Sequence, residues 1–146
     1  MSRKLTDLSP ATYRMWIEFD RGMRAAGIEY IMTCTYRSEA EQAELFARGR
    51  TKPGRIITNA PPGMSAHNAE LNGAPASEAF DVVPLRFGKA VWGTSGDGID
   101  DNPADDDTDD LELWQRVGVI GEKVGLQWAG RWKTFKEFPH FQNPEV

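Results

Sequence analysis

The chain has 146 residues, of which 40% are apolar and 27% are charged. A chain of this length can bury a hydrophobic core large enough to fold without disulfides or bound metals. We therefore expect a single domain over residues 1–146. No stretch approaches the roughly 18 apolar residues of a membrane span, and no apolar segment follows the basic N-terminus as in a secretory signal. We therefore expect no membrane insertion. The single cysteine, Cys34, excludes an internal disulfide, fits a reducing cytosol and is expected to be a buried, inert thiol.

The net charge of −5 is unevenly distributed along the chain. Residues 93–112 contain nine acidic side chains and no basic one, and the rest of the chain has 13 acidic against 17 basic residues. A mildly basic body suits an anionic polymer. Lysine and arginine are scattered and not interleaved with aromatic residues, so the pattern excludes a nucleic-acid-binding protein.

The first third of the chain predicts a helix followed by a strand. Ser9-Pro10 is a good helix start, with serine as the N-cap and proline at the first helical position, and Gly27 ends the helix. Residues 28–36 alternate enough to form a strand.

The next segments predict a second helix, a long loop and a strong strand. Ser38 to Glu41 reads as a capping box that opens a helix running to about Arg48. Residues 49–78 are rich in Gly, Pro, Asn and Ala and are expected to form a long loop, which in a compact domain is usually functional or disordered. Residues 79–85 should form a strand, and residues 86–92 could return as a hairpin.

The C-terminal part predicts a third helix over about residues 110–123. Its apolar face is formed by Leu113, Val117, Ile120 and Val124. Residues 126–142 are aromatic and short-stranded. The whole chain therefore predicts an α+β domain with three helices against a small, mainly antiparallel sheet.

Four residues form a candidate metal site. His67 and His140 are the only histidines, and Asp81 lies within an apolar run where a bare charge would be costly. Zinc in hydrolases takes three such ligands and leaves a position for water, and Glu137 could then act as the base. Each residue also has a purely structural reading, as a hydrogen-bonded histidine or an aspartate paired with an arginine. The spacing alone does not decide between them.

Several phrases, in one order, resemble a known peptidase family. They are Thr35-Tyr36-Arg37-Ser38 with Gln42, Gly49-Arg50-Thr51-Lys52-Pro53-Gly54, Ile57-Thr58-Asn59-Ala60, Pro62-Gly63-x-Ser65-x-His67-Asn68, Ala79-Phe80-Asp81-Val82, Gly125-Leu126-Gln127-Trp128 and Trp132-x-x-Phe135-Lys136-Glu137-Phe138-Pro139-His140-Phe141. Together they resemble the zinc-dependent peptidoglycan peptidases of family M15. The resemblance is strongest to the L-alanyl-D-glutamate endopeptidase branch of phage endolysins and bacterial cell-wall hydrolases, and it implies a D-Ala-D-Ala carboxypeptidase/Hedgehog-like fold.

The resemblance implies roles for particular residues. It assigns His67, Asp81 and His140 as the ligands of one zinc ion and Glu137 as the catalytic base. Arg37 matches a family arginine that contacts substrate or steadies charge near the scissile bond, although an ordinary salt bridge would look the same.

Two further positions have weaker assignments. Gln42 matches a substrate-side or supporting residue, but a glutamine on a helix surface would look the same. Ser65 is expected to orient the loop or a ligand through its hydroxyl group.

Three departures from the family pattern leave questions open. The gap between His67 and Asp81 is wider than usual because residues 70–76 look inserted, so Glu70 or Glu78 could compete with Asp81 as a ligand. Arg131 stands where many relatives have an acid near the cleft, which puts the substrate preference in question. The base is a glutamate where relatives often have an aspartate.

The acidic loop at about residues 93–110 raises the question of calcium. Asp105, Asp107 and Asp109 resemble the start of an EF-hand, but Asp110 occupies the position of the sharp-turn glycine and Arg116 that of the final glutamate. A solvated loop and a looser calcium site are the alternatives.

The function expected from these observations is hydrolysis of peptidoglycan stem peptides, between L-Ala and D-Glu, by a monomeric phage-type endolysin. Without a visible signal peptide, the protein would accumulate in the host cytoplasm and reach the wall through a holin-type pore. The alternatives are a D,D-carboxypeptidase or dipeptidase of the same superfamily and a non-catalytic wall-binding module that keeps zinc for structure.

Overall fold

A five-stranded antiparallel sheet forms the centre of the computed structural model, which describes residues 1–93 and 109–145. Four strands lie in the order β1 (Tyr30–Cys34), β4 (Ala79–Arg86), β7 (His140–Gln142) and β6 (Gln127–Trp128). The short β5 (Lys89–Ala90) returns from β4 as a hairpin. The predicted strands and hairpin are thus confirmed.

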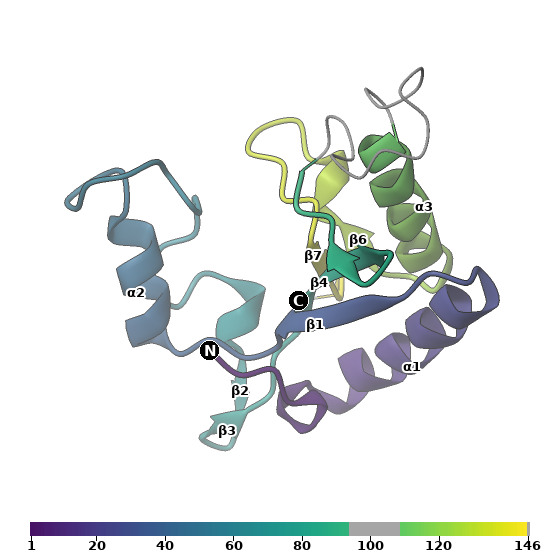
Figure 1. Cartoon of the computed structure of the whole chain (residues 1–146). Coiled ribbons are helices and arrows are strands. Elements are labelled where there is room, and N and C mark those ends of the chain that lie inside the picture. The colour runs from purple at the N-terminus through teal and green to yellow at the C-terminus, as the bar shows by residue number, and fades with distance from the viewer. Residues whose placement is uncertain (94–108, 146) are drawn as a thin grey trace.

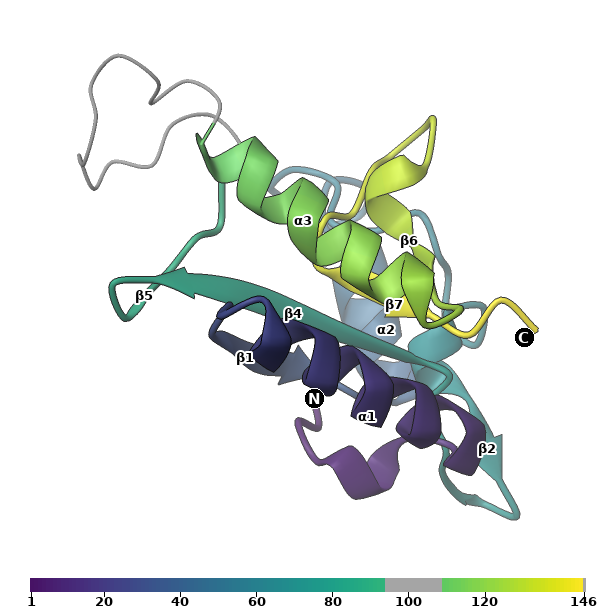
Figure 2. The ribbon, with the colours of Figure 1, turned by 90° about the vertical axis from the view of Figure 1, so that its right-hand side faces the viewer.

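In the described part of the chain, three α-helices accompany the sheet, as predicted. Helices α1 (Pro10–Ala25) and α3 (Asp109–Lys123) lie against one face, and α2 (Glu39–Ala47) lies on the opposite side (Figures 1 and 2). Short 3-10 turns occur at Leu5–Asp7 and Ala129–Arg131. None of the helices described is long and apolar enough to cross a membrane.

Local sequence signals account for the helix boundaries. The Ser9 hydroxyl accepts a hydrogen bond from the Thr12 amide at 3.1 Å, so it caps α1 directly before Pro10. Ser38 and Glu41 form the reciprocal capping box predicted for α2.

The core lies between the sheet and the α1–α3 layer. Phe80 and Val82 of β4 are completely buried and share this layer with Phe19 of α1 and Phe141 of β7. Side chains alternate along a strand, so Asp81 points to the other face of the sheet. That face carries the candidate site.

Two glycines let α3 approach the strands that lead to the site. A Cβ atom on Gly118 would meet the Trp128 ring at 2.2 Å, and one on Gly121 would meet the Phe141 ring at 2.3 Å. Real Cβ atoms do not come this close to ring carbons, so the packing of α3 on β6 and β7 requires glycine at both positions.

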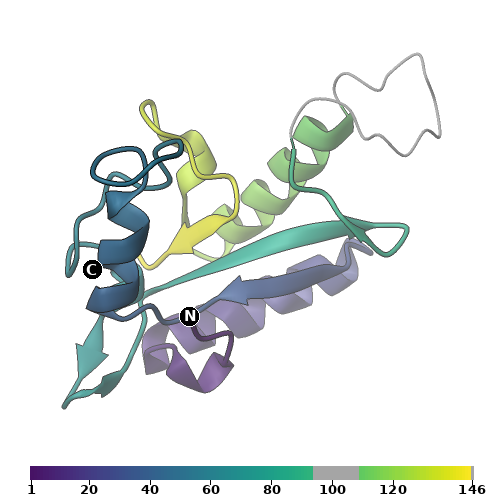
Figure 3. The same cartoon turned by 60° about the vertical axis from the view of Figure 1, so that its left-hand side comes forward.

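The long loop predicted over residues 49–78 contains short elements that the sequence analysis did not include. The segment contains a 3-10 turn at Ala66–Asn68 and a small hairpin of β2 (Glu70–Leu71) and β3 (Ala74–Pro75) (Figure 3). The hairpin turn is Asn72-Gly73, with φ of 54° and 80°. Asn-Gly is the preferred pair for such a turn, so the signal was present in the sequence.

Of the three residues proposed to bind calcium, one belongs to the described part of the chain. Asp105 and Asp107 lie outside the described residues, and Asp109 is the first residue of α3. The calcium site therefore stays a prediction.

Candidate active site

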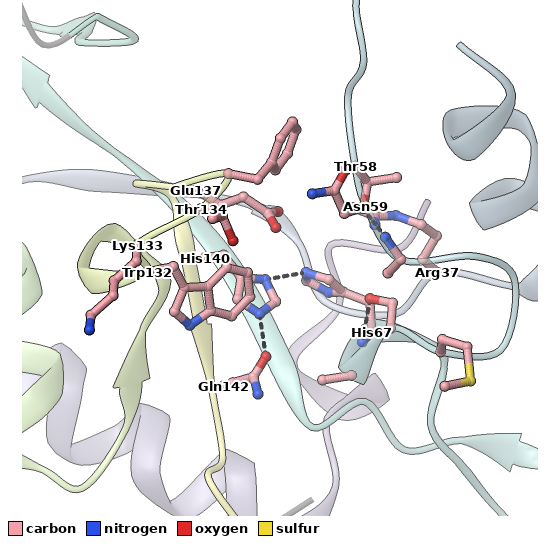
Figure 4. A pocket seen from close by; sticks show the side chains of 15 residues that line it. Arg37, Thr58, Asn59, His67, Trp132, Lys133, Thr134, Glu137, His140 and Gln142 are labelled. Carbon is pink, nitrogen blue, oxygen red and sulfur yellow. Dashed lines mark hydrogen bonds between the residues drawn. The ribbon is translucent and has the colours of Figure 1, made fainter. Parts of the chain in front are cut away.

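The sheet register places Asp81 at the centre of the site. Asp81 of β4 lies directly opposite His140 on β7 and opposite Cys34 on β1. His67 comes from the 3-10 turn at Ala66–Asn68, which lies beside the end of β1. Three segments far apart in the sequence therefore meet at one point, and Figure 4 shows the two histidines facing each other there.

Three donor atoms converge there. The Asp81 Oδ1 atom lies 3.1 Å from His67 Nε2 and 3.3 Å from His140 Nδ1, and the two nitrogens are 3.2 Å apart. Tetrahedral zinc with bonds of about 2.0–2.1 Å places its donors roughly 3.3 Å apart. The triangle therefore has the size that a zinc ion requires.

The other nitrogen of each histidine has its own acceptor. His67 Nδ1–H donates to the Thr35 carbonyl at 2.9 Å, and His140 Nε2–H donates to Gln142 Oε1 at 2.7 Å. With both protons directed outward, two nitrogen lone pairs and a carboxylate oxygen face one another in a buried position. Such a cluster requires a cation at its centre. The residues present thus fit zinc.

Cys34 offers a second grouping of possible ligands with His67 and Asp81. The Cys34 sulfur, however, lies 3.7 Å from His67 Nδ1, the nitrogen that contacts the Thr35 carbonyl. Cys34 therefore lies beside Nδ1 of His67, whereas Asp81 and His140 lie beside Nε2. A metal bound with Cys34 through Nδ1 would displace the hydrogen bond to Thr35. The grouping with His140 leaves the Thr35 hydrogen bond intact and is favoured for that reason.

Burial and mutual contacts shift the acid–base properties of these groups. Burial disfavours the charged form of Asp81, yet in the metal-free site the charge of a protonated His67 and hydrogen bonds from histidines that carry a proton toward Asp81 hold its pKa far below the usual range. Burial dominates for His67 and lowers its pKa. For His140, burial is outweighed by the Asp81 carboxylate, which raises the pKa.

Glu137 lies beside the donor triangle on the segment that leads into β7. Its amide donates to the Ala129 carbonyl at 3.2 Å, and its own carbonyl accepts from the His140 amide at 3.1 Å. Its carboxylate lines the cavity near His140 (Figure 4). Burial, together with the Asp81 charge, raises the pKa of Glu137, as suits a group that takes and returns a proton near neutral pH.

Arg37 adjoins the site through its guanidinium group, which lies near Asp81. One guanidinium nitrogen lies 3.8 Å from Asp81 Oδ2, and another donates to Gln42 Oε1 at 2.8 Å. Gln42 is fully buried and also donates to the Ala60 carbonyl at 2.7 Å. Gln42 therefore fixes Arg37 against the loop that lines the cavity, and it is not a helix-surface residue.

The turn that carries His67 is held by a cap. The Ser65 hydroxyl accepts from the His67 amide at 3.2 Å, which is the loop-orienting contact expected of it. Asn68, which stood in a matched phrase without an assigned role, accepts from the Ser65 amide at 3.2 Å and donates to the Arg37 carbonyl at 2.7 Å. These bonds join the His67 turn to the Arg37 segment.

A cavity of about 430 Å³ opens above these groups. It is lined by Arg37, Thr58, Asn59, Ala60, Met64, Ser65, Ala66, His67, Trp132, Lys133, Thr134, Phe135, Glu137, His140 and Gln142. A second hollow of about 570 Å³ shares Phe135, Glu137 and His140 and extends past Asp81. The space therefore continues on both sides of Glu137. Thr58, Asn59 and Trp132 stood in the matched phrases without assigned roles, and Gln142 of β7 was not named in the sequence analysis.

The two carboxylates that could have competed with Asp81 as zinc ligands are paired with other side chains. Glu70 accepts from the Tyr36 hydroxyl at 2.5 Å, and Glu78 accepts from the Thr12 hydroxyl at 2.7 Å. Arg131 pairs with Glu122 of α3 at 3.1 Å. The insertion is absorbed by the β2–β3 hairpin, which keeps Asp81 opposite His140.

Two family models match this chain. A peptidase M15 family model, described as D-alanyl-D-alanine carboxypeptidase, matches residues 61–143, which include the whole donor triangle and Glu137. The chain belongs to this family. A second model, VanY, with the same description, matches residues 5–74. Peptidases of family M15 are zinc-dependent, in agreement with the donor set found here.

Two individual proteins similar to this chain are L-alanyl-D-glutamate endopeptidases. The chain is 35% identical over 117 residues to the peptidoglycan L-alanyl-D-glutamate endopeptidase CwlK of Bacillus subtilis (strain 168), a match that covers 80% of this chain and 61% of that relative. Its fold is similar to that of the Serratia marcescens L-Ala D-Glu endopeptidase ChiX, with a TM-score of 0.60 at 20% identity. That match covers 95% of this chain and 82% of the other. The predicted family and fold class are confirmed.

Proposed function

We propose that this M15 family member is a zinc endopeptidase that cleaves peptidoglycan stem peptides between L-Ala and D-Glu. The observation that carries the proposal is the convergence of three donor atoms beside Glu137, with space on both sides of that carboxylate. An internal peptide bond needs room for chain on either side, and the relatives named above are endopeptidases of this specificity.

In the proposed mechanism His67, Asp81 and His140 hold the metal. When bound, zinc supplies a Lewis acid that polarises a carbonyl and makes water more acidic. Glu137 takes a proton from the attacking water and passes it to the leaving amine. Arg37, fixed by Gln42, supplies positive charge to the oxygen that becomes negative in the transition state.

A D,D-carboxypeptidase is the main rival, because both matching family models are described by that activity. Such an enzyme removes one terminal residue and has to recognise a free carboxylate. Its leaving side needs to hold a single residue, whereas two hollows adjoin Glu137 here. A non-catalytic zinc module is disfavoured by the buried carboxylate of Glu137 beside the donors.

Defined muropeptides separate these functions. Digestion followed by mass spectrometry should give a new N-terminal D-Glu and a new C-terminal L-Ala. Release of free D-Ala instead would establish the carboxypeptidase, and binding without any new amino group would establish the wall-binding module.

The cellular setting is a separate part of the proposal. A monomeric, single-domain endolysin would act from the host cytoplasm through a holin-type pore, and its support is the resemblance of the sequence phrases to phage endolysins. Expression in bacteria with and without a pore-forming protein tests this route. Rapid lysis should require both proteins and an intact Glu137, and lysis without the pore would refute the route.

A further inference from the structure

We propose that Gln142, supported by Gln127, is a positioning residue that holds His140 in its metal-binding tautomer. This inference rests on the proposed zinc site but not on the identity of the peptide bond. His140 can bind a metal through Nδ1 only when its proton is on Nε2, and Nε2 contacts Gln142 Oε1 at 2.7 Å. A carbonyl oxygen can only accept a hydrogen bond, so this contact keeps the proton on Nε2.

Gln142 alone does not ensure the correct tautomer, because a glutamine side chain can rotate by 180° about its last bond. The rotated amide would direct its NH₂ group at His140 Nε2, which would then have to be an acceptor. The proton would move to Nδ1 and occupy the position of the metal.

In the structure Gln127 presents its own oxygen to Gln142, which matches the productive orientation. Its Oε1 atom accepts a hydrogen bond from Gln142 Nε2 at 3.1 Å, which is possible only when Gln142 Oε1 faces His140. The relay therefore runs from Gln127 through Gln142 to His140 and ends at the donor triangle.

The sheet builds this relay by register. Gln127 of β6 lies directly opposite Gln142 of β7, as Asp81 of β4 lies opposite His140. His140 and Gln142 are two residues apart and point to the same face, while Phe141 between them is buried in the core. One cross-strand pair on this face, Asp81 and His140, supplies two proposed zinc ligands. The other pair, Gln127 and Gln142, supplies the hydrogen bond to His140. The partner of His67 is the Thr35 carbonyl, which no side-chain substitution can remove.

Zinc affinity, measured by competition with a chromophoric chelator, tests the relay without any substrate. Outer hydrogen-bond partners of metal-bound histidines contribute about 10- to 100-fold to metal affinity. Gln142→Leu, which keeps the size and removes the acceptor, should weaken zinc binding within this range. Gln142→Glu keeps an acceptor and removes the wrong orientation, so it should restore the affinity. Gln127→Leu should have a smaller effect, about threefold.

Two controls keep the outcome interpretable. Gln115→Leu changes an exposed glutamine of α3 and should leave the affinity unchanged. The melting temperature of the metal-free Gln142→Leu protein should match that of the unaltered protein, which excludes a folding defect. Unchanged zinc affinity in Gln142→Leu, or equal loss in Gln142→Leu and Gln142→Glu, would overturn the proposal. Failure to cleave an L-Ala–D-Glu bond would overturn the proposed specificity and leave this result standing.

Discussion

Asp81 and His140 belong to neighbouring strands of the central sheet, whereas His67 and Arg37 lie on loop segments beside it. The strand residues face each other because β4 and β7 are paired in register. The loop residues are held by hydrogen bonds that the Ser65 and Gln42 side chains accept and by one that the Asn68 side chain donates. The sheet region of the site therefore depends on the core behind it, and the loop region depends on individual polar contacts.

This difference predicts how each region fails. A residue in the loop region should affect activity strongly and stability weakly, because its contacts are local. Residues behind the sheet region should affect both, since the strands that carry Asp81 and His140 also form the core wall. The following substitutions test this contrast.

Removal of a histidine from either region should have the largest effect. His67→Ala and His140→Ala each leave two ligands, and zinc sites in enzymes use three from the protein. We expect each purified variant to lose bound zinc in metal analysis and to lose measurable hydrolysis. A variant that keeps one equivalent of zinc would remove that histidine from the ligand set.

In the loop region, Arg37→Ala should lower kcat/KM about a hundredfold, the cost typical of a lost oxyanion donor. Gln42→Leu leaves Arg37 and the Ala60 carbonyl without their partner and should lower it about tenfold. Zinc content should be unchanged in both. If Gln115→Leu, an exposed control, reduced activity as much as Gln42→Leu, the positioning role would be refuted.

Behind the sheet region, Gly121→Ala should destabilise the fold by about 1–3 kcal/mol because the new methyl group would collide with Phe141. Gly93→Ala is the control, since a Cβ atom at that position would have no heavy atom within 4 Å. Urea unfolding of both variants measures the difference. Equal stability would show that β7 is not held by the packing of α3.

Cys34 adjoins both regions and should show the smallest effect. Burial raises the pKa of its thiol to about 11, so about one thiol in a thousand is ionised at pH 8. Alkylation by iodoacetamide should be about a hundredfold slower than in the urea-unfolded chain. Reaction at the rate of the unfolded chain would contradict the buried position of this residue.

The sequence predicted the elements with strong local signals. Serine caps, the Gly27 terminator and alternation in residues 79–85 located the helices and the main strand within about two residues. The Asn72-Gly73 hairpin was missed because its two-residue strands are too short for a periodic pattern.

The candidate site was predicted less evenly. The two histidines, the aspartate in an apolar run and Glu137 suggested a metal site from the residues alone. The resemblance to a peptidase family then assigned their roles, and the structure brings the four residues together. Asn68 stood in a matched phrase without a role, and Gln142 was not named. The role of Asn68 comes from a contact with Arg37 across 31 positions, and that of Gln142 from its contacts with His140 on its own strand and with Gln127 on the paired strand. Such contacts leave no local pattern.

The central claim is that Glu137 acts as a base beside a zinc ion that it does not bind. Glu137→Gln keeps the size of the side chain and removes its ability to take a proton. Zinc content and muropeptide cleavage should be measured on the same preparations of the unaltered protein and this variant. We predict one zinc per chain in both and a loss of cleavage of at least about a hundredfold in the variant. Cleavage by Glu137→Gln within tenfold of the unaltered rate, or loss of its zinc, would contradict the account.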